Sequence, residues 1–466
     1  MSDTLTRPTA AAAAVVEHCD TSRATSHATE PLCSVIGANL PVPVVTGGTL
    51  PYANLDYAAS APALTVVAEH LATALPYYAS VHRGAGYASQ VSTALLENSR
   101  SRVAAFFGAR HDDVVVFTRN TTDALNLLAC AVPEGGTVLY LDVEHHANLI
   151  PWQRRGHVVL EAAPTIRETL EDLDAALAAT PTALVAVTGA SNVTGELLPI
   201  ERIARIAHRH GARIAVDAAQ LAPHRRISLA ESDLDYIVLS GHKLYAPYGA
   251  GALVGRRDWL DAAPPHLAGG GAVTEVSTDA TRWAAAPHRH EGGTPNVIGA
   301  AALAQACRTL GPVLDGPGPE HERALLARLD AGLASVPGVT PLRAWADAAD
   351  QVAVRSFTVA DRPAGYVAAY LSAEHGIGVR DGRFCAHPLL ARLCGPAGEA
   401  IRVSIGLGTT AGQIDRLVDA LATLVTRGAC WTYAPVGGRW TPTPDPRELD
   451  PLGLGTGATA GPACGR

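Results

Sequence analysis

The chain has 466 residues, of which 48% are hydrophobic and 17% charged, and its formal net charge at pH 7 is −8. The length exceeds the roughly 250 residues that one domain commonly reaches, so we expect two domains, and the apolar content excludes a disordered chain. The negative charge disfavours nucleic-acid binding. No uncharged apolar run approaches ~18 residues, which predicts that no helix spans a membrane, and no signal segment is recognisable, which predicts a cytoplasmic protein.

Residues 1–48 are rich in Ala, Thr, Ser and Pro without a strong period, which predicts a flexible N-terminal arm. Short β runs then alternate with amphipathic helices, and this alternation predicts a mainly parallel sheet covered on both faces, within a large domain spanning residues 49–315. The first residues of this domain could also pack with the second domain. The expected strands are 114–117, 138–141, 183–188, 213–216 and 236–239, and the expected helices are 122–131, 169–179 and 199–210.

A Gly/Pro break near residues 311–319 precedes a second, smaller α+β domain over residues 316–430. Residues 431–466 hold 7 Gly and 6 Pro, which predicts a loosely ordered tail. The small domain is expected to contain helices at 320–334, 363–375 and 411–426 and strands at 352–359 and 401–404.

The chain contains a single lysine, Lys243, beside 35 arginines. An ordinary chain of this length would carry on the order of 25 lysines. Arginine can replace lysine as a surface charge, but its guanidinium stays protonated and is a poor nucleophile. Lys243 is therefore a candidate for amine chemistry, such as a Schiff base with a carbonyl cofactor, and a surface lysine near a turn is the alternative.

Polar motifs follow the predicted strands, at the edge where open α/β sheets place their ligands. Hydroxyl groups near a helix start (Thr121, Thr122) can hold a phosphate, and Asp217 can keep a pyridine nitrogen protonated. His145 can stack on a flat ring, with no cysteine or carboxylate set beside it that indicates a metal site. Helix capping and solvated loop histidines are the ordinary alternatives for each motif alone. Together with Ser240, His242 and Lys243, they form an ordered set for pyridoxal phosphate (PLP).

A cysteine loop lies further along the chain, over residues 380–388. Cys385 has Arg380 and Arg383 before it and His387 after it, an electropositive setting that favours a thiolate. A buried structural cysteine is the alternative.

The sequence resembles the cysteine desulfurases of the class V aminotransferase fold, closest to the iron–sulfur-assembly group that shares its fold with selenocysteine lyase. The resemblance spans residues 54 to about 425 and implies PLP fold type I, with a mainly parallel seven-stranded sheet and a smaller α+β domain. It is carried by NLDYAASA (54–61), VHRG (81–84), TRNTTDALNL (118–127), EHHANLIPWQ (144–153), SNVTGE (191–196), VDAAQ (216–220), SGHKLYAPYG (240–249), EGGTPN (291–296) and VRDGRFCAHPLL (379–390).

The resemblance also implies residue roles. Lys243 would carry PLP as an internal aldimine, His145 would stack on the ring, and Asp217 would pair with the ring nitrogen. Cys385 would accept the sulfur. The cofactor would further contact Thr121, Thr122, Asn192, Gln220, Ser240 and His242; the substrate would contact His82, Asn192, Arg380 and Arg402, with Arg402 clamping its carboxylate; and Thr294 would reach the phosphate of the neighbouring subunit in a homodimer.

Two departures from the family pattern touch the substrate pocket. Arg383 and Phe384 stand where the family usually has two histidines, and Gly408-Thr409-Thr410 stands where it usually has an aromatic–Asn–Thr run. The leading hypothesis is a desulfurase that converts L-cysteine to L-alanine, leaves a persulfide on Cys385 and passes the sulfur to an acceptor protein. A selenocysteine lyase, a C–S lyase or an amino-acid epimerase in a secondary pathway is the alternative, and a non-catalytic scaffold is a third.

Overall fold

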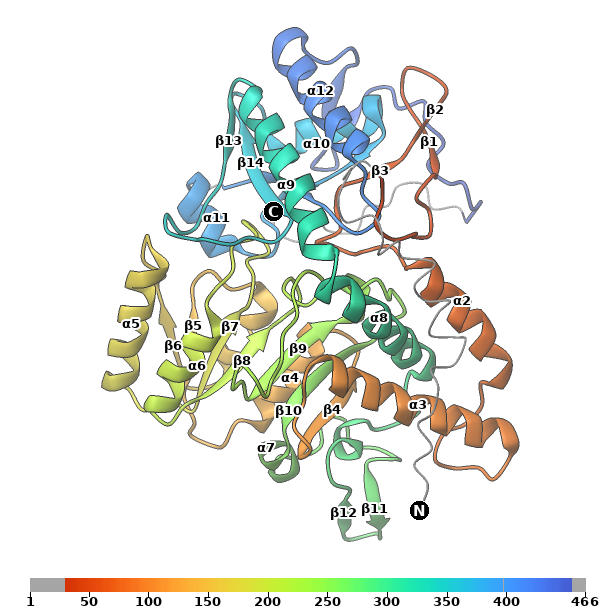
Figure 1. Ribbon diagram of the computed structural model, residues 1–466, viewed down its shortest axis with the longest axis vertical. Coiled ribbons are helices and arrows are strands. Elements are labelled where there is room, and N and C mark those ends of the chain that lie inside the picture. Colours follow the sequence, from red (N-terminus) through yellow and green to blue (C-terminus); the bar gives the residue numbers. More distant parts are fainter. Residues whose placement is uncertain (1–29, 397, 455–466) are drawn as a thin grey trace.

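The computed structural model describes residues 30–396 and 398–454, arranged as a lower part built on a large sheet and an upper part built on a small one (Figure 1). The predicted arm over residues 1–29 and the tail over residues 455–466 lie outside the described residues.

The large sheet has seven strands in the order β4-β10-β9-β8-β7-β5-β6. Strands β9, β8, β7, β5 and β6 are parallel neighbours, while β10 is antiparallel to both β4 and β9. The predicted mainly parallel sheet is thus confirmed, and β6 and β10 are the two strands that the prediction left out. The strands are β4 (Asp113–Thr118), β5 (Val138–Leu141), β6 (His157–Leu160), β7 (Leu184–Thr188), β8 (Arg213–Asp217), β9 (Tyr236–Ser240) and β10 (Gly251–Arg256).

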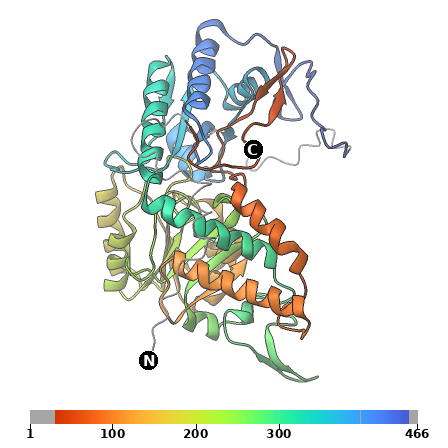
Figure 2. The same ribbon diagram turned by 45° about the vertical axis from the view of Figure 1, so that its right-hand side comes forward.

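Both faces of this sheet are buried, because alternate residues of each strand point to opposite sides. In β7, Val185 and Val187 join one core, while Leu184 and Ala186 join the other. Helices α5, α6 and α8 contribute to the first core and α4 and α7 to the second; α3 and α8 pack along each other (Figure 2). The helices are α2 (Thr65–Ala74), α3 (Tyr87–Phe106), α4 (Thr121–Ala131), α5 (Ile166–Ala179), α6 (Ile200–Arg209), α7 (Arg257–Ala262) and α8 (Val297–Asp315).

Helix α8 is the one helix in the described part of the chain that is long and apolar enough to cross a membrane. Because 83% of its most apolar window is buried inside the protein, it packs as a core helix does.

The small domain is built on a four-stranded antiparallel sheet in the order β13-β14-β17-β16. The five elements predicted here (α9, β14, α10, β17 and α12) are found with ends within two residues of the predicted ones, whereas β13, β15, β16 and α11 were not predicted. The elements are α9 (Gly318–Ser335), β13 (Val339–Pro341), β14 (Val354–Val359), α10 (Ala364–His375), β15 (Ile377–Gly378), β16 (Arg380–Gly382), α11 (His387–Cys394), β17 (Ala400–Ser404) and α12 (Ala411–Arg427).

Both ends of the described chain pack on this small domain. Strand β3 pairs with β15 in parallel, and the Val45 N–H donates to the Ala373 carbonyl at 2.9 Å. Residues 30–48 and 431–454, assigned by sequence to a flexible arm and a loose tail, therefore include paired strands. Val45 and Tyr433 from these segments are buried in the core that contains α10, whereas Leu32 and Val35 are buried in the first core of the large sheet. The domain bounds themselves stay predictions.

The remaining strands lie outside the two main sheets. They are β1 (Pro41–Pro43), β2 (Thr49–Pro51), β3 (Ala53–Asn54), β18 (Tyr433–Val436) and β19 (Arg439–Pro442), while β11 (Val273–Val276) and β12 (Thr281–Trp283) form a projecting hairpin (Figure 1).

Candidate active site

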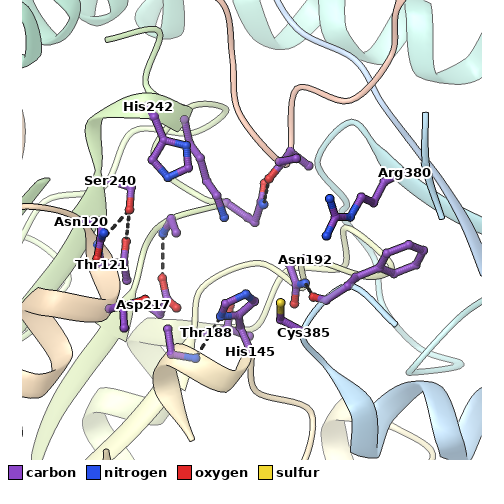
Figure 3. Close-up of a pocket in the computed structure, with 18 of the residues that line it drawn as sticks. Asn120, Thr121, His145, Thr188, Asn192, Asp217, Ser240, His242, Arg380 and Cys385 are labelled. Atoms are coloured by element: carbon purple, nitrogen blue, oxygen red, sulfur yellow. Dashed lines mark hydrogen bonds between the residues drawn. The ribbon is translucent and has the colours of Figure 1, made fainter. Parts of the chain in front are cut away.

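A cavity of about 300 Å³ lies at the carboxyl ends of β8 and β9 and takes residues from both domains (Figure 3). It brings together every predicted site residue except His82 and Thr294. Its lining consists of Ala58, Ala59, Asn120, Thr121, Thr122, His145, Ala147, Thr188, Asn192, Asp217, Ala219, Gln220, Ser240, His242, Lys243, Arg380, Phe384, Cys385 and Arg402.

One end of the cavity is a hydroxyl-rich helix start. Asn120 caps α4 by accepting the Asp123 N–H at 3.0 Å, and Thr121 contacts Ser240 through its N–H (2.8 Å) and its hydroxyl (2.7 Å). Gly251 lets β10 approach this turn, because a Cβ there would lie 2.7 Å from the Asn120 Cα and 2.5 Å from the Leu239 oxygen. A helix start with hydroxyl groups is an anion-binding arrangement.

The middle of the cavity holds Asp217 and Lys243. Asp217 ends β8, accepts the Ala219 N–H at 2.9 Å, and is buried, which raises the pKa of its carboxyl. Lys243 lies in the turn after β9, where removal from water lowers the pKa of its amine to about 8. This pKa is a balance: burial and the charge of Arg402 lower it, whereas Asp217, Cys385 and Asp56 raise it. An amine with this pKa is deprotonated in an appreciable fraction near neutral pH, as a nucleophile or base requires.

Two histidines on the cavity wall are neutral. Burial, reinforced by Lys243, lowers the pKa of His145 to about 3 and that of His242 to about 4. The Nδ1 atom of His145 accepts the Ala147 N–H at 3.0 Å, which fixes the ring and leaves the proton on Nε2. Gln220 is also fixed, since its side-chain N–H donates to the Ala58 oxygen at 2.7 Å.

Arg402 reaches the cavity from β17 of the small domain. Its Nη1 donates to the Asn192 carbonyl at 3.0 Å and its Nη2 to Asp56 Oδ1 at 3.1 Å. The Phe384 ring lies over the guanidinium, with its centroid 5.2 Å from Cζ, and Nε is buried without a hydrogen-bond partner. The cavity therefore contains an arginine whose Nε–H has no hydrogen-bond partner.

Sequence reasoning missed the roles of Asp56 and Phe384. Asp56 lies inside the motif at 54–61, but nothing local in the sequence indicates that it pairs with a residue 346 positions away. Glu144 was also missed: its buried carboxyl accepts from Asn148 (2.7 Å) and Thr188 (3.0 Å) beside His145.

The Cys385 loop is held in an unusual backbone conformation. Phe384 (φ 49°) and Cys385 (φ 54°) both lie in the left-handed region, which costs free energy for residues other than glycine. Two hydrogen bonds of 2.8 Å hold this loop to the large domain: the Asn192 side chain donates to the Phe384 oxygen, and the His146 N–H donates to the Cys385 oxygen. Figure 3 shows Cys385 and Asn192 on the side of the cavity opposite Ser240 and Thr121.

The two remaining predicted residues, His82 and Thr294, lie in a second cavity of about 640 Å³. His82 Nε2 is 3.1 Å from Glu97 Oε1. Within one chain the structure does not bring either residue to Lys243, so their roles stay predictions. In the described part of the chain, no three His, Cys, Asp or Glu side chains gather in a way that could hold a metal ion.

Comparisons with known proteins cover most of the chain. Residues 53–417 match the family described as aminotransferase class-V. The chain is 39% identical over 403 residues to a cysteine desulfurase of Enterobacter sp. (strain 638), covering 83% of this chain and 96% of that one. It is 35% identical over 409 residues to a cysteine desulfurase of Escherichia coli, with the same coverage. The apo structure of a cysteine desulfurase from Thermococcus onnurineus NA1 superposes with a TM-score of 0.74 at 31% identity, covering 80% and 94% of the two chains.

Proposed function

The chain belongs to the class V aminotransferase family as a homologue of the cysteine desulfurases, as its motifs predicted, and we propose that it converts L-cysteine to L-alanine with Cys385 as the sulfur acceptor. The observation that carries this proposal is the meeting of Lys243, Asp217, Arg402 and Cys385 around one cavity. An amine, a buried carboxylate, a carboxylate-binding guanidinium and a thiol are the four groups that this reaction requires.

The family depends on PLP, and the residues around the cavity fit this cofactor. The helix start at Thr121 and Thr122, with Ser240 and His242, suits its phosphate, and Asp217 suits its ring nitrogen. Lys243 is the chain's only lysine, so no other side-chain amine can link to the aldehyde. When bound, PLP supplies an electron-withdrawing ring that stabilises negative charge on the substrate's Cα.

The residues of this chain then have separate tasks. Lys243, with its lowered pKa, takes the proton from the substrate's Cα and returns it. Burial raises the pKa of Asp217 because it removes water from the carboxylate. A protonated ring nitrogen beside Asp217 would offset this effect and keep the carboxyl ionised. His145 is neutral, and its fixed ring offers a flat face to the cofactor. Asn192 and Gln220 supply side-chain amides at the same wall, and Gln220 would bind the phenolic oxygen of the cofactor.

The substrate's carboxylate binds Arg402 in this proposal, with Arg380 near it. Arg402 has an unpartnered Nε and a second donor on Asp56, so an incoming carboxylate can take both in a bidentate pair. Cys385 Sγ attacks the sulfur of the substrate: the S–S bond forms as the substrate's Cβ–S bond breaks, and the carbon fragment leaves as alanine after protonation. The product on the protein is a persulfide on Cys385.

Three further properties belong to the proposal. Thr294 completes the phosphate site of a second subunit, so that the enzyme works as a homodimer, and His82 lines the same subunit junction. An acceptor protein takes the sulfur from Cys385. We assign the enzyme to the cytoplasm as part of this proposal, and the buried packing of α8 as a core helix agrees with it.

The test is the variant Cys385→Ala, assayed for alanine production from L-cysteine. We expect it to retain the absorbance of bound PLP and to lose nearly all alanine production, because the substrate's sulfur then has no nucleophile. Peptide mass spectrometry of the wild type after brief exposure to cysteine should find one added sulfur on the Cys385 peptide. Cys394→Ala is the matched control, since this cysteine is nearby in sequence but does not line the cavity.

If Cys385→Ala still releases alanine at a rate near that of the wild type, the desulfurase proposal is wrong. A selenocysteine lyase, C–S lyase or epimerase would then be the better description, because each needs Lys243 but no attacking thiol. Parallel assays with L-cysteine, L-selenocysteine and cystine distinguish these activities.

A further inference from the structure

A cysteine, a histidine and an aspartate meet on α4, outside the cavity that holds Lys243. Asp123 lies in the first turn of α4 and Cys130 in the last, seven residues later, so both project from one face of the helix. His266 comes from the loop after α7 and lies against this face. Its Nε2 is 3.0 Å from Asp123 Oδ1, and its ring also hydrogen-bonds the Cys130 thiol. None of the three lines the active-site cavity.

The charges in this triad are fixed by its neighbours. Asp123 also accepts hydrogen bonds from the Arg119 side chain (3.1 and 3.2 Å), and these contacts with His266 and Arg119 hold the pKa of Asp123 far below its usual range. Asp123 in turn raises the pKa of His266 to about 9, with Cys130 acting in the same direction. His266 is held in place by its N–H, which donates to Nδ1 of His290 at 3.2 Å. The imidazolium form therefore faces the thiol at neutral pH.

Other charges near Cys130 act in the same direction. The Arg155 side chain donates to the carbonyl oxygens of Ala129 and, at 2.8 Å, Pro133, which flank Cys130. Arg154 and Arg155 both favour a negative charge on the thiol. The carbonyl groups at the end of α4 oppose that charge, but only weakly, because a helix terminus carries about half a unit charge. The net effect, led by the hydrogen bond from His266, is a lowered pKa of Cys130.

The other described cysteines whose pKa shift is resolved have the opposite environment. Cys430 is exposed, like Cys130, but the neighbouring Glu374 raises its pKa to about 11. Burial raises the pKa of Cys307 and of Cys394. Cys130 is therefore the exposed thiol with a histidine and a carboxylate arranged behind it, the order of groups that activates cysteine nucleophiles.

We propose that Cys130 is a second nucleophilic thiol of this chain, activated by Asp123 and His266, and that it exchanges with small disulfides. Cys130 Sγ attacks one sulfur of the disulfide, and a mixed disulfide forms on the protein as the original S–S bond breaks. The electron pair of that bond leaves with the released thiolate, which takes a proton from water. The small disulfide is the oxidant, so the step needs no other reactant.

The expected reaction rate of Cys130 can be compared with that of Cys430. At pH 7 a thiol with a pKa of about 11 is ~0.01% thiolate, whereas one below the ordinary value of 9.0 is more than ~1% thiolate. The more basic thiolate is intrinsically more reactive by about 8-fold over two pKa units. Cys130 should therefore react at least about tenfold faster than Cys430 at pH 7.

The experiment exposes the PLP-loaded enzyme to 2-hydroxyethyl disulfide, an uncharged probe that the arginines cannot attract. Quenched samples are digested, and mass spectrometry follows the modification of each cysteine peptide between pH 6 and pH 8. We expect the Cys130 peptide to react at least tenfold faster than the Cys430 peptide at pH 7.

The variant His266→Gln removes the imidazolium, so the rate at Cys130 should fall severalfold while the rate at Cys430 stays unchanged. Near-ultraviolet circular dichroism reports whether the variant is folded, and Asp123→Asn replaces it if it is not. Equal rates at Cys130 and Cys430, or an unchanged Cys130 rate in a folded variant, would overturn the proposal. The readout is the modified peptide, so it is independent of whether the enzyme desulfurates cysteine.

Discussion

The variant Arg402→Lys tests the proposed carboxylate clamp. The Arg402 guanidinium uses Nη1 on Asn192 and Nη2 on Asp56 and keeps Nε unpartnered, so its fork geometry can present two parallel donors to a substrate. A lysine keeps the charge but offers a single nitrogen that cannot reproduce this pair. The loss of one charged hydrogen bond is worth about 1.5–3 kcal/mol. This corresponds to a roughly 10- to 150-fold lower kcat/KM for L-cysteine.

The assay is initial-rate alanine release over a range of L-cysteine concentrations, with thermal melting to show that the variant is folded. A rise in KM larger than the change in kcat would show that the substrate's ground-state binding is lost. Arg383→Lys is the control, since Arg383 carries the same charge in the same loop but does not line the cavity. Unchanged KM and kcat in a folded Arg402→Lys enzyme would refute the clamp.

Three other outcomes are expected. Borohydride reduction of the PLP-loaded enzyme should label only the peptide that contains Lys243, and label on any other peptide in mass spectrometry would contradict Lys243 as the PLP-binding residue. The variant Lys243→Ala should abolish turnover. Gly251→Ala should lower the free energy of unfolding by about 1–3 kcal/mol and weaken PLP binding, because its Cβ would meet backbone at 2.5 Å. Gly412→Ala is the control and should cost nothing in a urea titration, because its Cβ would meet only Thr410 Oγ1, at an ordinary contact distance of 3.9 Å. Since the pKa of His266 is raised by Asp123, their pair stabilises the fold fully below pH 6.5 and loses that effect as pH rises through about 9. The stability difference between wild type and His266→Gln, up to about 3 kcal/mol at pH 6, should therefore shrink by pH 10; a constant difference would show that this linkage is absent.

The sequence was informative wherever local pattern decides structure. The alternation of short β runs with helices located five of the seven strands of the large sheet, and the position of polar residues after those strands located Asp217 and Lys243 at one edge. Strands β6 and β10 were both missed. In β10, GALVGR carries two glycines, which weaken a strand pattern, and the antiparallel direction of this strand has no local signal.

The parts that could not be predicted depend on contacts between distant segments. Asp56 and Arg402 are paired only because β17 and the turn after β3 lie side by side. The left-handed conformation of Phe384 and Cys385 is held by Asn192 and His146, which belong to the large domain, and no property of residues 380–388 encodes it. Residues 30–48 carry little periodicity, so their order depends on distant partners: Leu32 bonds to the Leu407 carbonyl and Val45 to that of Ala373 in α10.

The small domain joins the two ends of the chain, and this affects how the protein can fold while the ribosome makes it. Ala58 donates its N–H to the Ser404 hydroxyl across 346 positions, and Ser404 donates its N–H to the Leu55 carbonyl. At a synthesis rate of about 5–20 residues per second, the segment around Leu55 waits roughly 17 to 70 s for its partners. The large sheet, whose strands end at residue 256, can form during that interval, but the pair between Asp56 and Arg402 cannot. A nascent chain therefore completes its cavity only after residue 404 has been made, and until then the apolar side chains around Leu55 remain exposed to chaperones and to other nascent chains.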